Sequence, residues 1–328
     1  MKRMLPLLCA LLLLAACGPA LPPEDSDRLQ IVAAVFPAYD FARAAAGDLA
    51  DVTLLLPPGA ESHSYEPTPA DILRVQRCDL FLYLGGESDA WVDTILSAIE
   101  PKGETLRMID CVDLLEEETV EGMQGGHDHD HDHEEDHEHD HDHEEDHEHL
   151  GEVVGMDEHV WTDPENAAVI TRTIGERLAL LDPENGETYR TNAEGYALEL
   201  EALGRDFAAF FDGRADRTIV FGDRFPLLYF AEAYDLDYYA AFPGCGAQTE
   251  PSAATVAFLT RKVQEVGLPT VWYIEFSNHL VADSIAEAAG VETAQFQTCH
   301  NVSKADLEAG ATYLSLMRAN LEALREHM

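Results

Sequence analysis

The chain of 328 residues is too long for one ordinary hydrophobic core and fits two compact lobes of average size. Its 20 basic and 63 acidic residues give a formal net charge of −43, which excludes nucleic acid and anionic membrane surfaces as partners because both would repel it. A field of this sign attracts cations, so the composition favours a cationic ligand.

The first 17 residues have the features of a bacterial export signal. Two basic residues open it, residues 5–16 are apolar but too few to span a bilayer, and it ends in Leu-Ala-Ala-Cys. That ending resembles a lipobox, in which the cysteine, here Cys17, is lipidated; the alternative is a plain cleaved signal with an incidental cysteine. Residues 18–27 would form a proline-rich tether. We therefore expect a lipid-anchored, extracytoplasmic protein on the outer face of the bacterial cytoplasmic membrane.

Short apolar runs alternate with amphipathic stretches in both halves of the mature chain, as in parallel strands joined by crossover helices. The predicted strands lie near residues 31–36, 52–56, 80–84 and 105–109, and then near 218–221, 236–242, 270–274 and 293–296. Helices are predicted near 225–234, 251–265 and 278–289. The predicted fold is therefore α/β, with two lobes that each contain a four-stranded, mainly parallel sheet and flanking helices.

A long helix is predicted between the lobes, from about residue 184 to 211. Its apolar stripe consists of Tyr189, Ala193, Tyr196, Leu200, Leu203, Phe207 and Phe210, and we expect it to pack into the core. A final helix presents Leu314, Met317, Leu321 and Leu324 on one face. The mature chain accordingly divides into an N-terminal lobe (28–182), a connecting helix (183–212) and a C-terminal lobe (213–328).

A run of ten histidines and thirteen acidic residues fills positions 127–149, inside a predicted disordered insertion over 121–152. It contains no apolar group to bury, so it has nothing to offset the entropy of ordering. Imidazoles suit zinc, copper or nickel, and the carboxylates attract any cation. The run is therefore a predicted accessory metal site, through His127, His129, His131, His133, His137, His139, His141, His143, His147 and His149.

Two segments of the run, 133–137 and 143–147, spell the zinc-protease pattern H-E-x-x-H. That chemistry requires a buried helix with both imidazoles on one face, and no such helix is expected here. We interpret both matches as products of a composition limited to three residue types. An expression tag is also disfavoured, because the run lies in the middle of the chain and is rich in acidic residues.

Three more histidines lie in predicted loops. His63 follows the second strand, His159 precedes a helix, and His300 follows the eighth strand. Loops at the carboxyl ends of parallel strands open into a shared crevice, so these side chains can converge between the lobes. By contrast, His279 and Asp283 have the sequence context of a helix start on the surface.

Three motifs occur in order: P-G-A-E-S-H-S-Y-E-P at residues 58–67, the histidine-rich run, and D-E-H-V-W-T-D-P at 157–164. With the C-terminal pattern Tyr313, Met317, Asn320 and Leu321, they resemble the zinc and manganese solute-binding proteins of ABC uptake transporters, known as cluster A-I. The resemblance covers nearly the whole mature chain. It implies two α/β lobes bridged by one rigid helix, a metal ion held between them, a monomer, and an ABC permease and ATPase as partners.

The resemblance also implies a ligand set, with one departure. The family places a third ligand, His or Glu, directly after the first strand of the second lobe, where this chain has Gly-Asp-Arg-Phe-Pro at 222–226. Asp223 is the nearest residue able to ligate, although it could instead pair with Arg224 or cap the next helix. The predicted metal ligands are therefore His63, His159, Asp223 and His300, with Glu275 as a substitute.

Three imidazoles and one carboxylate suit tetrahedral zinc, whereas manganese, the second candidate, prefers more oxygen ligands. Glu61, Glu66 and Glu275 are available to raise that oxygen count. We therefore predict a non-enzymatic zinc carrier, since four protein ligands leave no position for a catalytic water. The alternatives are a manganese homologue, a zinc hydrolase with a water beside Glu275, and a surface metal buffer or adhesin.

The cysteines left in the mature domain are Cys78, Cys111, Cys245 and Cys299. If their strands run parallel, Cys78 and Cys111 lie at opposite ends of a sheet and beyond disulfide reach. Cys245 and Cys299 each follow a strand at the same sheet edge, so that pair is the favoured disulfide in an oxidising compartment.

Overall fold

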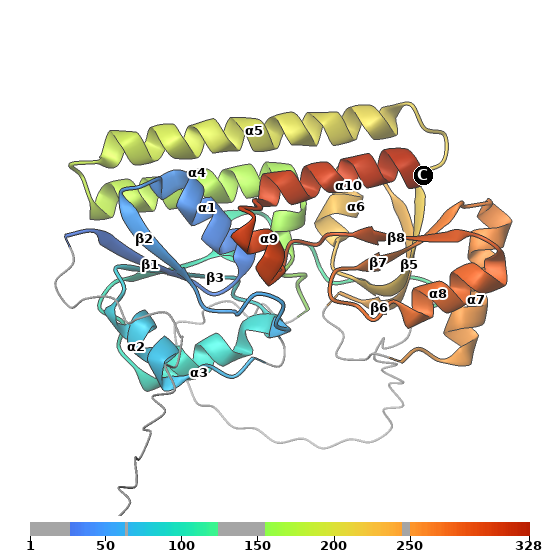
Figure 1. Cartoon of the computed structure of the whole chain (residues 1–328), viewed down its shortest axis with the longest axis horizontal. Helices are drawn as coiled ribbons and strands as arrows, with labels where there is room; N and C mark the ends of the chain where they lie inside the picture. Colours follow the sequence, from blue (N-terminus) through green and yellow to red (C-terminus); the bar gives the residue numbers. More distant parts are fainter. Residues whose placement is uncertain (1–26, 63–64, 124–154, 245–249) are drawn as a thin grey trace, which may run out of the picture.

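A computed structural model describes residues 27–62, 65–123, 155–244 and 250–328. The predicted signal with Cys17, the histidine-rich run, His63 and Cys245 lie outside these residues. Within them the chain forms two α/β lobes side by side, with one long helix lying across both (Figure 1). The predicted fold class is confirmed.

The first lobe contains four parallel strands in the order β2-β1-β3-β4. Such strands are covered on both faces and are therefore largely apolar; all four residues of β3 are buried. Helix α1 covers one face and α2 and α3 the other (Figure 1). The strands are β1 (Leu29–Ala33), β2 (Ala50–Leu54), β3 (Leu80–Tyr83) and β4 (Glu104–Arg107), and the helices are α1 (Phe36–Ala46), α2 (Pro69–Arg77), η2 (Glu87–Asp89), α3 (Ala90–Ala98) and η3 (Met108–Cys111).

The second lobe repeats this topology in the order β6-β5-β7-β8, again with parallel pairs throughout. Its strands are β5 (Thr218–Phe225), β6 (Asp237–Pro243), β7 (Thr270–Ile274) and β8 (Glu292–Phe296). Its helices are α6 (Leu228–Tyr234), α7 (Ala253–Val266) and α8 (Leu280–Ala289), followed by α9 (Lys304–Glu308) and α10 (Tyr313–His327).

Strand β5 is longer than predicted and contains a register shift. Phe221 pairs with Ala240 of β6 but Arg224 pairs with Phe242, so β5 has one extra residue over that interval. Bulges of this kind bend a strand and re-aim its side chains. The residues of β5 beyond Phe221 therefore face directions that a regular strand would not give them.

Helix α5 (Gly186–Asp212) packs against α4 (Pro164–Leu181) and α1 near the first lobe, and reaches α6 and α10 near the second (Figure 1). Its close approach to α4 depends on Gly175, where a Cβ atom would lie 2.5 Å from that of Ala193. Five of the seven predicted stripe residues are buried, but Tyr196 and Phe210 are only half-buried, and their neighbours Ala197 and Phe211 are buried instead. Phe210 lies beneath the guanidinium of Arg214.

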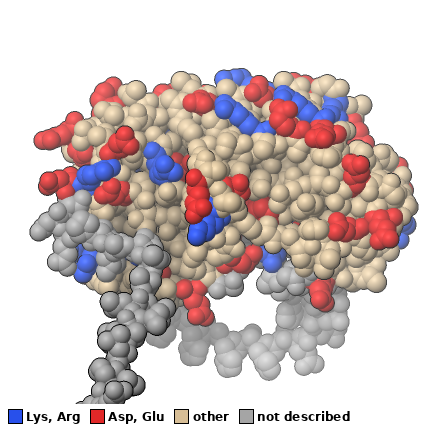
Figure 2. Space-filling view, in the orientation of Figure 1, with Lys and Arg blue, Asp and Glu red and all other residues tan. Residues whose placement is uncertain are grey.

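The solvent side of these helices is polar. Basic and acidic side chains interleave along the upper edge of the molecule in Figure 2. Between these helices, Arg172 of α4 forms ion pairs with Glu194 and Glu201 of α5, at 2.7 and 2.8 Å. Such exposed pairs stabilise little, so the buried stripe supplies most of the packing energy.

The segment after β8 returns to the first lobe and ties the lobes together. The buried Asn301 donates from Nδ2 to the carbonyl oxygens of Pro57 and Ala60 at 2.9 and 2.8 Å. The amide of Gly59 donates to the carbonyl of Val302 at 2.9 Å. Residues of both lobes also share one hydrophobic cluster, so the interlobe surface is packed.

Cys78 and Cys111 are free thiols at opposite ends of the parallel pair β3–β4, as predicted. Cys299 forms no disulfide within the described part of the chain, and its predicted partner Cys245 lies outside that part. The Cys245–Cys299 pairing therefore stays a prediction. No helix among the described residues is both long and apolar enough to span a bilayer.

Candidate metal site

A small cavity lies where the two lobes meet, with a volume of about 50 Å³. Its size suits an ion with little water, because one water takes about 30 Å³ and organic ligands need roughly 300 Å³ or more. The ionisable side chains that line it are Glu61, His159, Arg224, Glu275 and His300. They come from loops after β2 and β8, from the segment before η4 (Val160–Thr162), and from β5 and the end of β7.

His159 and His300 face each other across this cavity. Their ring centroids are 6.0 Å apart and their planes are inclined by 75°. With metal–nitrogen bonds of about 2.0–2.1 Å, two imidazoles that share one zinc ion have centroids roughly 5–6 Å apart. The two rings are therefore placed to bind one ion with small adjustments.

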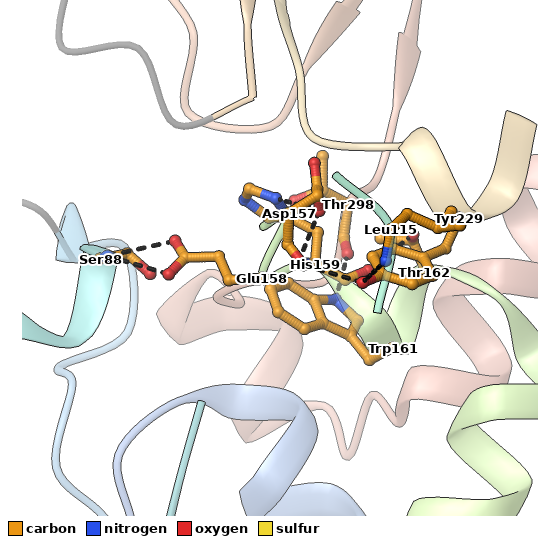
Figure 3. Close-up of polar contacts among 9 residues, drawn as sticks. All are labelled: Ser88, Leu115, Asp157, Glu158, His159, Trp161, Thr162, Tyr229 and Thr298. Atoms are coloured by element: carbon orange, nitrogen blue, oxygen red, sulfur yellow. Dashed lines mark hydrogen bonds and ion pairs between the residues drawn. The ribbon is translucent and has the colours of Figure 1, made fainter. Parts of the chain in front are cut away.

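Asp157 fixes the orientation of His159 (Figure 3). Its Oδ1 lies 3.0 Å from Nδ1 of His159 and accepts from the His159 backbone amide at 2.8 Å. Burial lowers the pKa of His159, but the charge and hydrogen bond of Asp157, together with the charges of Glu158 and Glu117, more than reverse this, so the net pKa is raised. With Nδ1 directed at Asp157, Nε2 is the nitrogen available to a metal, which is how carboxylates orient ligating histidines.

Glu158 points away from its neighbours and toward the first lobe (Figure 3). Its carboxylate accepts from the Ser88 amide at 3.0 and 3.2 Å. Gly86 is required here, because a Cβ atom would lie 1.9 Å from Glu158 Oε2. The buried Asp89 lies close by, and burial together with the Glu158 charge raises its pKa to about 7. Glu158 thus anchors the segment that carries His159 to the first lobe.

The ring of Trp161 packs edge-on against the ring of His300. Its ring centroid is 5.2 Å from that of His300, and its Nε1 donates to the carbonyl of Thr298 at 2.8 Å. The tryptophan is fully buried, so its donor needs this partner. One side chain from the His159 segment therefore positions the loop that carries His300.

Glu275 organises the same loop. Its Oε2 accepts from the Thr298 amide at 2.7 Å and its Oε1 from the Thr298 hydroxyl at 2.6 Å. Burial raises the pKa of Glu275, and the Thr298 hydrogen bonds oppose that change. Cys299 has a φ of 61°, a left-handed conformation that is uncommon for a non-glycine residue. Glu275 therefore holds a strained turn directly before His300.

Asp223 does not line the cavity that contains His159 and His300. It lines an adjacent cavity of about 240 Å³, and its Oδ1 accepts from the Arg224 backbone amide at 2.8 Å. Arg224, the next residue, faces the site in its place. Among the described residues, no group of three or more His, Cys, Asp and Glu side chains is already arranged as a metal site.

The structure therefore brings together His159, His300 and Glu275 in one cavity and places Asp223 in the adjoining one, which Glu61, Arg224 and Glu275 also line. The predicted ligand His63 lies outside the described residues, although Glu61 and Ser62 of the same loop line the cavity. Reasoning from the sequence missed the supporting roles of Asp157, Trp161 and Thr298. The first two are in the motif at 157–164, and that spacing is the signal that could have revealed them.

Comparisons with known proteins agree with this architecture. The family model described as "Zinc-uptake complex component A periplasmic" matches residues 31–327. The chain is 30% identical over 323 residues to the zinc-binding lipoprotein AdcA of Streptococcus pneumoniae, covering 97% of this chain and 59% of that protein. It is 30% identical over 321 residues to the high-affinity zinc uptake system protein ZnuA of Bacillus subtilis, with 97% and 94% covered.

A solved structure extends the agreement to three dimensions. The Zn(II)-bound ZnuA-like domain of Streptococcus pneumoniae AdcA superposes with a TM-score of 0.70 at 26% identity, covering 92% of this chain and 98% of that domain. The chain thus spans about three fifths of the streptococcal relative and nearly all of that domain and of the Bacillus protein. On the family match over residues 31–327, the chain belongs to the family of periplasmic zinc-uptake complex component A.

Proposed function

We propose that this protein captures a zinc ion between its two lobes, outside the cytoplasm, and delivers it to the permease and ATPase of an ABC importer. The observation that carries the proposal is the convergence of His159 and His300 on one ion-sized cavity at the junction of the lobes. A monomer tethered by a lipid on Cys17 would hold this cavity close to the permease.

The proposed ligands are His159 and His300, together with His63 from the loop whose residues Glu61 and Ser62 line the cavity. A carboxylate completes the set. Asp223 and Glu275 are the candidates, and each would have to turn toward the ion, Glu275 by releasing Thr298. Imidazole-rich coordination favours zinc over manganese. The names of the relatives favour the same metal.

Binding rather than catalysis is the expected role. A zinc hydrolase needs a water at an open coordination position and a general base aimed at it. Glu275, directly after β7, is the acidic side chain that could serve, but both its oxygens accept hydrogen bonds from Thr298. Its observed contacts shape the loop of His300, which is a structural function.

The histidine-rich run is proposed as an accessory that gathers ions near the cavity. The described segments on either side of it pair with each other: the Glu117 amide donates to the Gly155 carbonyl at 2.7 Å, and the Asp157 amide donates to the Leu115 carbonyl at 2.9 Å. The segment from Leu115 also contacts the second lobe, where Tyr229 Oη accepts from the Leu115 amide at 3.0 Å. Ions released by the run would therefore start close to His159.

The test is a competitive zinc titration of the mature chain with a fluorescent chelator. The chelator binds zinc tightly enough that the weak sites of the histidine-rich run do not compete with it. His159→Ala and His300→Ala should each weaken the single tight site by at least about a hundredfold, because each removes a direct ligand. His279→Asn is the matched control, since His279 is exposed, pairs with Asp283 and has a φ of 47° that asparagine tolerates. Unchanged affinity in both alanine variants would rule out this site.

A further inference from the structure

A positively charged side chain lies in the cavity proposed to bind a cation. Arg224 lines it together with His159 and His300, and its Nη1 is 3.1 Å from Oε1 of Glu61. Glu61 belongs to the first lobe and Arg224 to β5 of the second, so this ion pair crosses between the lobes. The Arg224 side chain is 17% exposed and that of Glu61 52%.

The bulge in β5 decides that Arg224, rather than Asp223, faces the site. In a regular register Asp223 would pair with Phe242, whereas here Arg224 does. The extra residue of a bulge re-aims the side chains beside it. Here Arg224 lines the cavity of His159 and His300, whereas Asp223 reaches only the adjoining cavity, which both residues line. A carboxylate able to bind the ion is thereby replaced by a guanidinium of the same charge sign as the ion.

The two cations cannot occupy this small cavity together without a large cost. Two like charges that share a small cavity partly shielded from water repel strongly, and a divalent ion roughly doubles the repulsion caused by a monovalent one. An arginine in a protein does not lose its proton to relieve the repulsion. The guanidinium must therefore move out when the ion enters, and its ion pair with Glu61 breaks.

We propose that Arg224 determines the zinc affinity of this site, because zinc must displace its guanidinium. This inference rests on the proposed function. Without zinc, its guanidinium occupies the cation position and pairs with Glu61 across the lobes. Zinc displaces the guanidinium, and the Glu61 carboxylate, beside the proposed ligands, then balances the charge of the ion in place of that of Arg224. Arg224 thereby weakens zinc binding relative to the same site without it, which favours later release.

The experiment is a chelator-competition titration of the mature chain with zinc alone as the probe. Arg224→Met should bind zinc at least about tenfold more tightly, because it removes the competing charge and frees Glu61. Arg224→Lys retains the charge and should remain near the wild-type affinity. Glu61→Gln should bind at least about tenfold more weakly. Arg217→Met, which removes an ion-paired arginine just before β5, is the control and should change nothing.

Thermal unfolding of the zinc-free variants separates displacement from a purely structural role. If Arg224 only ties the lobes together, Arg224→Met lowers the midpoint and leaves zinc affinity unchanged or weaker, which overturns the inference. If Arg224→Met fails to fold, Glu61→Gln, at a half-exposed position, provides the test instead. A wild-type zinc affinity in Glu61→Gln would also contradict the inference. A wild-type protein without a tight site would instead refute the proposed function itself.

Discussion

Replacing Asp157 by asparagine tests how the site prepares His159 for a metal ion. The variant keeps an oxygen that can accept from the His159 backbone amide and from Nδ1, but it removes the negative charge. Hydrogen bonds to charged groups contribute about 1.5–3 kcal/mol and neutral ones about 0.5–1.5 kcal/mol. Replacing the charged acceptor by a neutral one should therefore reduce the free energy of zinc binding by about 1.4 kcal/mol, the approximate difference between these two ranges. This corresponds to about tenfold weaker zinc binding, within the range known for such outer-shell partners.

Competitive zinc titration of the mature chain measures this loss directly. The chain contains its own matched control, because Asp283 Oδ2 lies 2.9 Å from Nδ1 of His279 in a similar pair on the surface. Asp283→Asn should leave zinc affinity unchanged. If Asp157→Asn also leaves it unchanged while the protein stays folded, then His159 is not a ligand whose orientation depends on Asp157.

Three further predictions concern the framework of the site. Burial raises the pKa of Asp89 to about 7 in the fold against an ordinary 3.8, so the folded state binds more protons and stability falls as pH rises between these values. Asp89→Asn should remove about 2–4 kcal/mol of this loss, seen as urea midpoints that decline less from pH 5 to pH 8 than those of the wild type. Asn301→Ala removes the Asn301 hydrogen bonds to the Pro57 and Ala60 carbonyls, of which the Pro57 carbonyl keeps its bond from the Ala60 amide. The variant should lower the free energy of unfolding by about 2 kcal/mol and weaken zinc binding; equal urea curves would refute this. Gly222→Ala places a Cβ atom 2.4 Å from the Ala282 Cα and should lower the free energy of unfolding by about 3 kcal/mol. The measurement is the thermal midpoint, which should fall; an unchanged midpoint would show that α8 moves freely.

The fold could be predicted from the sequence because parallel strands buried on both faces carry a strong signal. The run Leu-Phe-Leu-Tyr at 80–83 is a continuous buried strand, and the predicted strand 270–274 coincides with β7. The last turn of the α5 stripe was less well determined. Phe210 and Phe211 are adjacent aromatic residues, and only the packing against α6 decides which of them is buried.

The site was predictable only where its residues lie in short motifs. His159 stands in a compact motif next to the aspartate and tryptophan that position it, so local sequence identifies it. The side on which Asp223 points depends on a bulge, which arises from pairing with a distant strand and has no local signature here. The interlobe ion pair of Arg224 with Glu61 joins residues separated by 163 positions, so no local sequence pattern predicts it.

The central claim is that one zinc ion binds between the lobes through His159 and His300. Anomalous diffraction at the zinc edge, from crystals of the mature protein loaded with one equivalent of zinc, tests it most directly. The account predicts one dominant peak in the interlobe cavity, about 2.0–2.1 Å from a ring nitrogen of each histidine. A cavity without a peak, with the ion bound elsewhere on the protein, would contradict it.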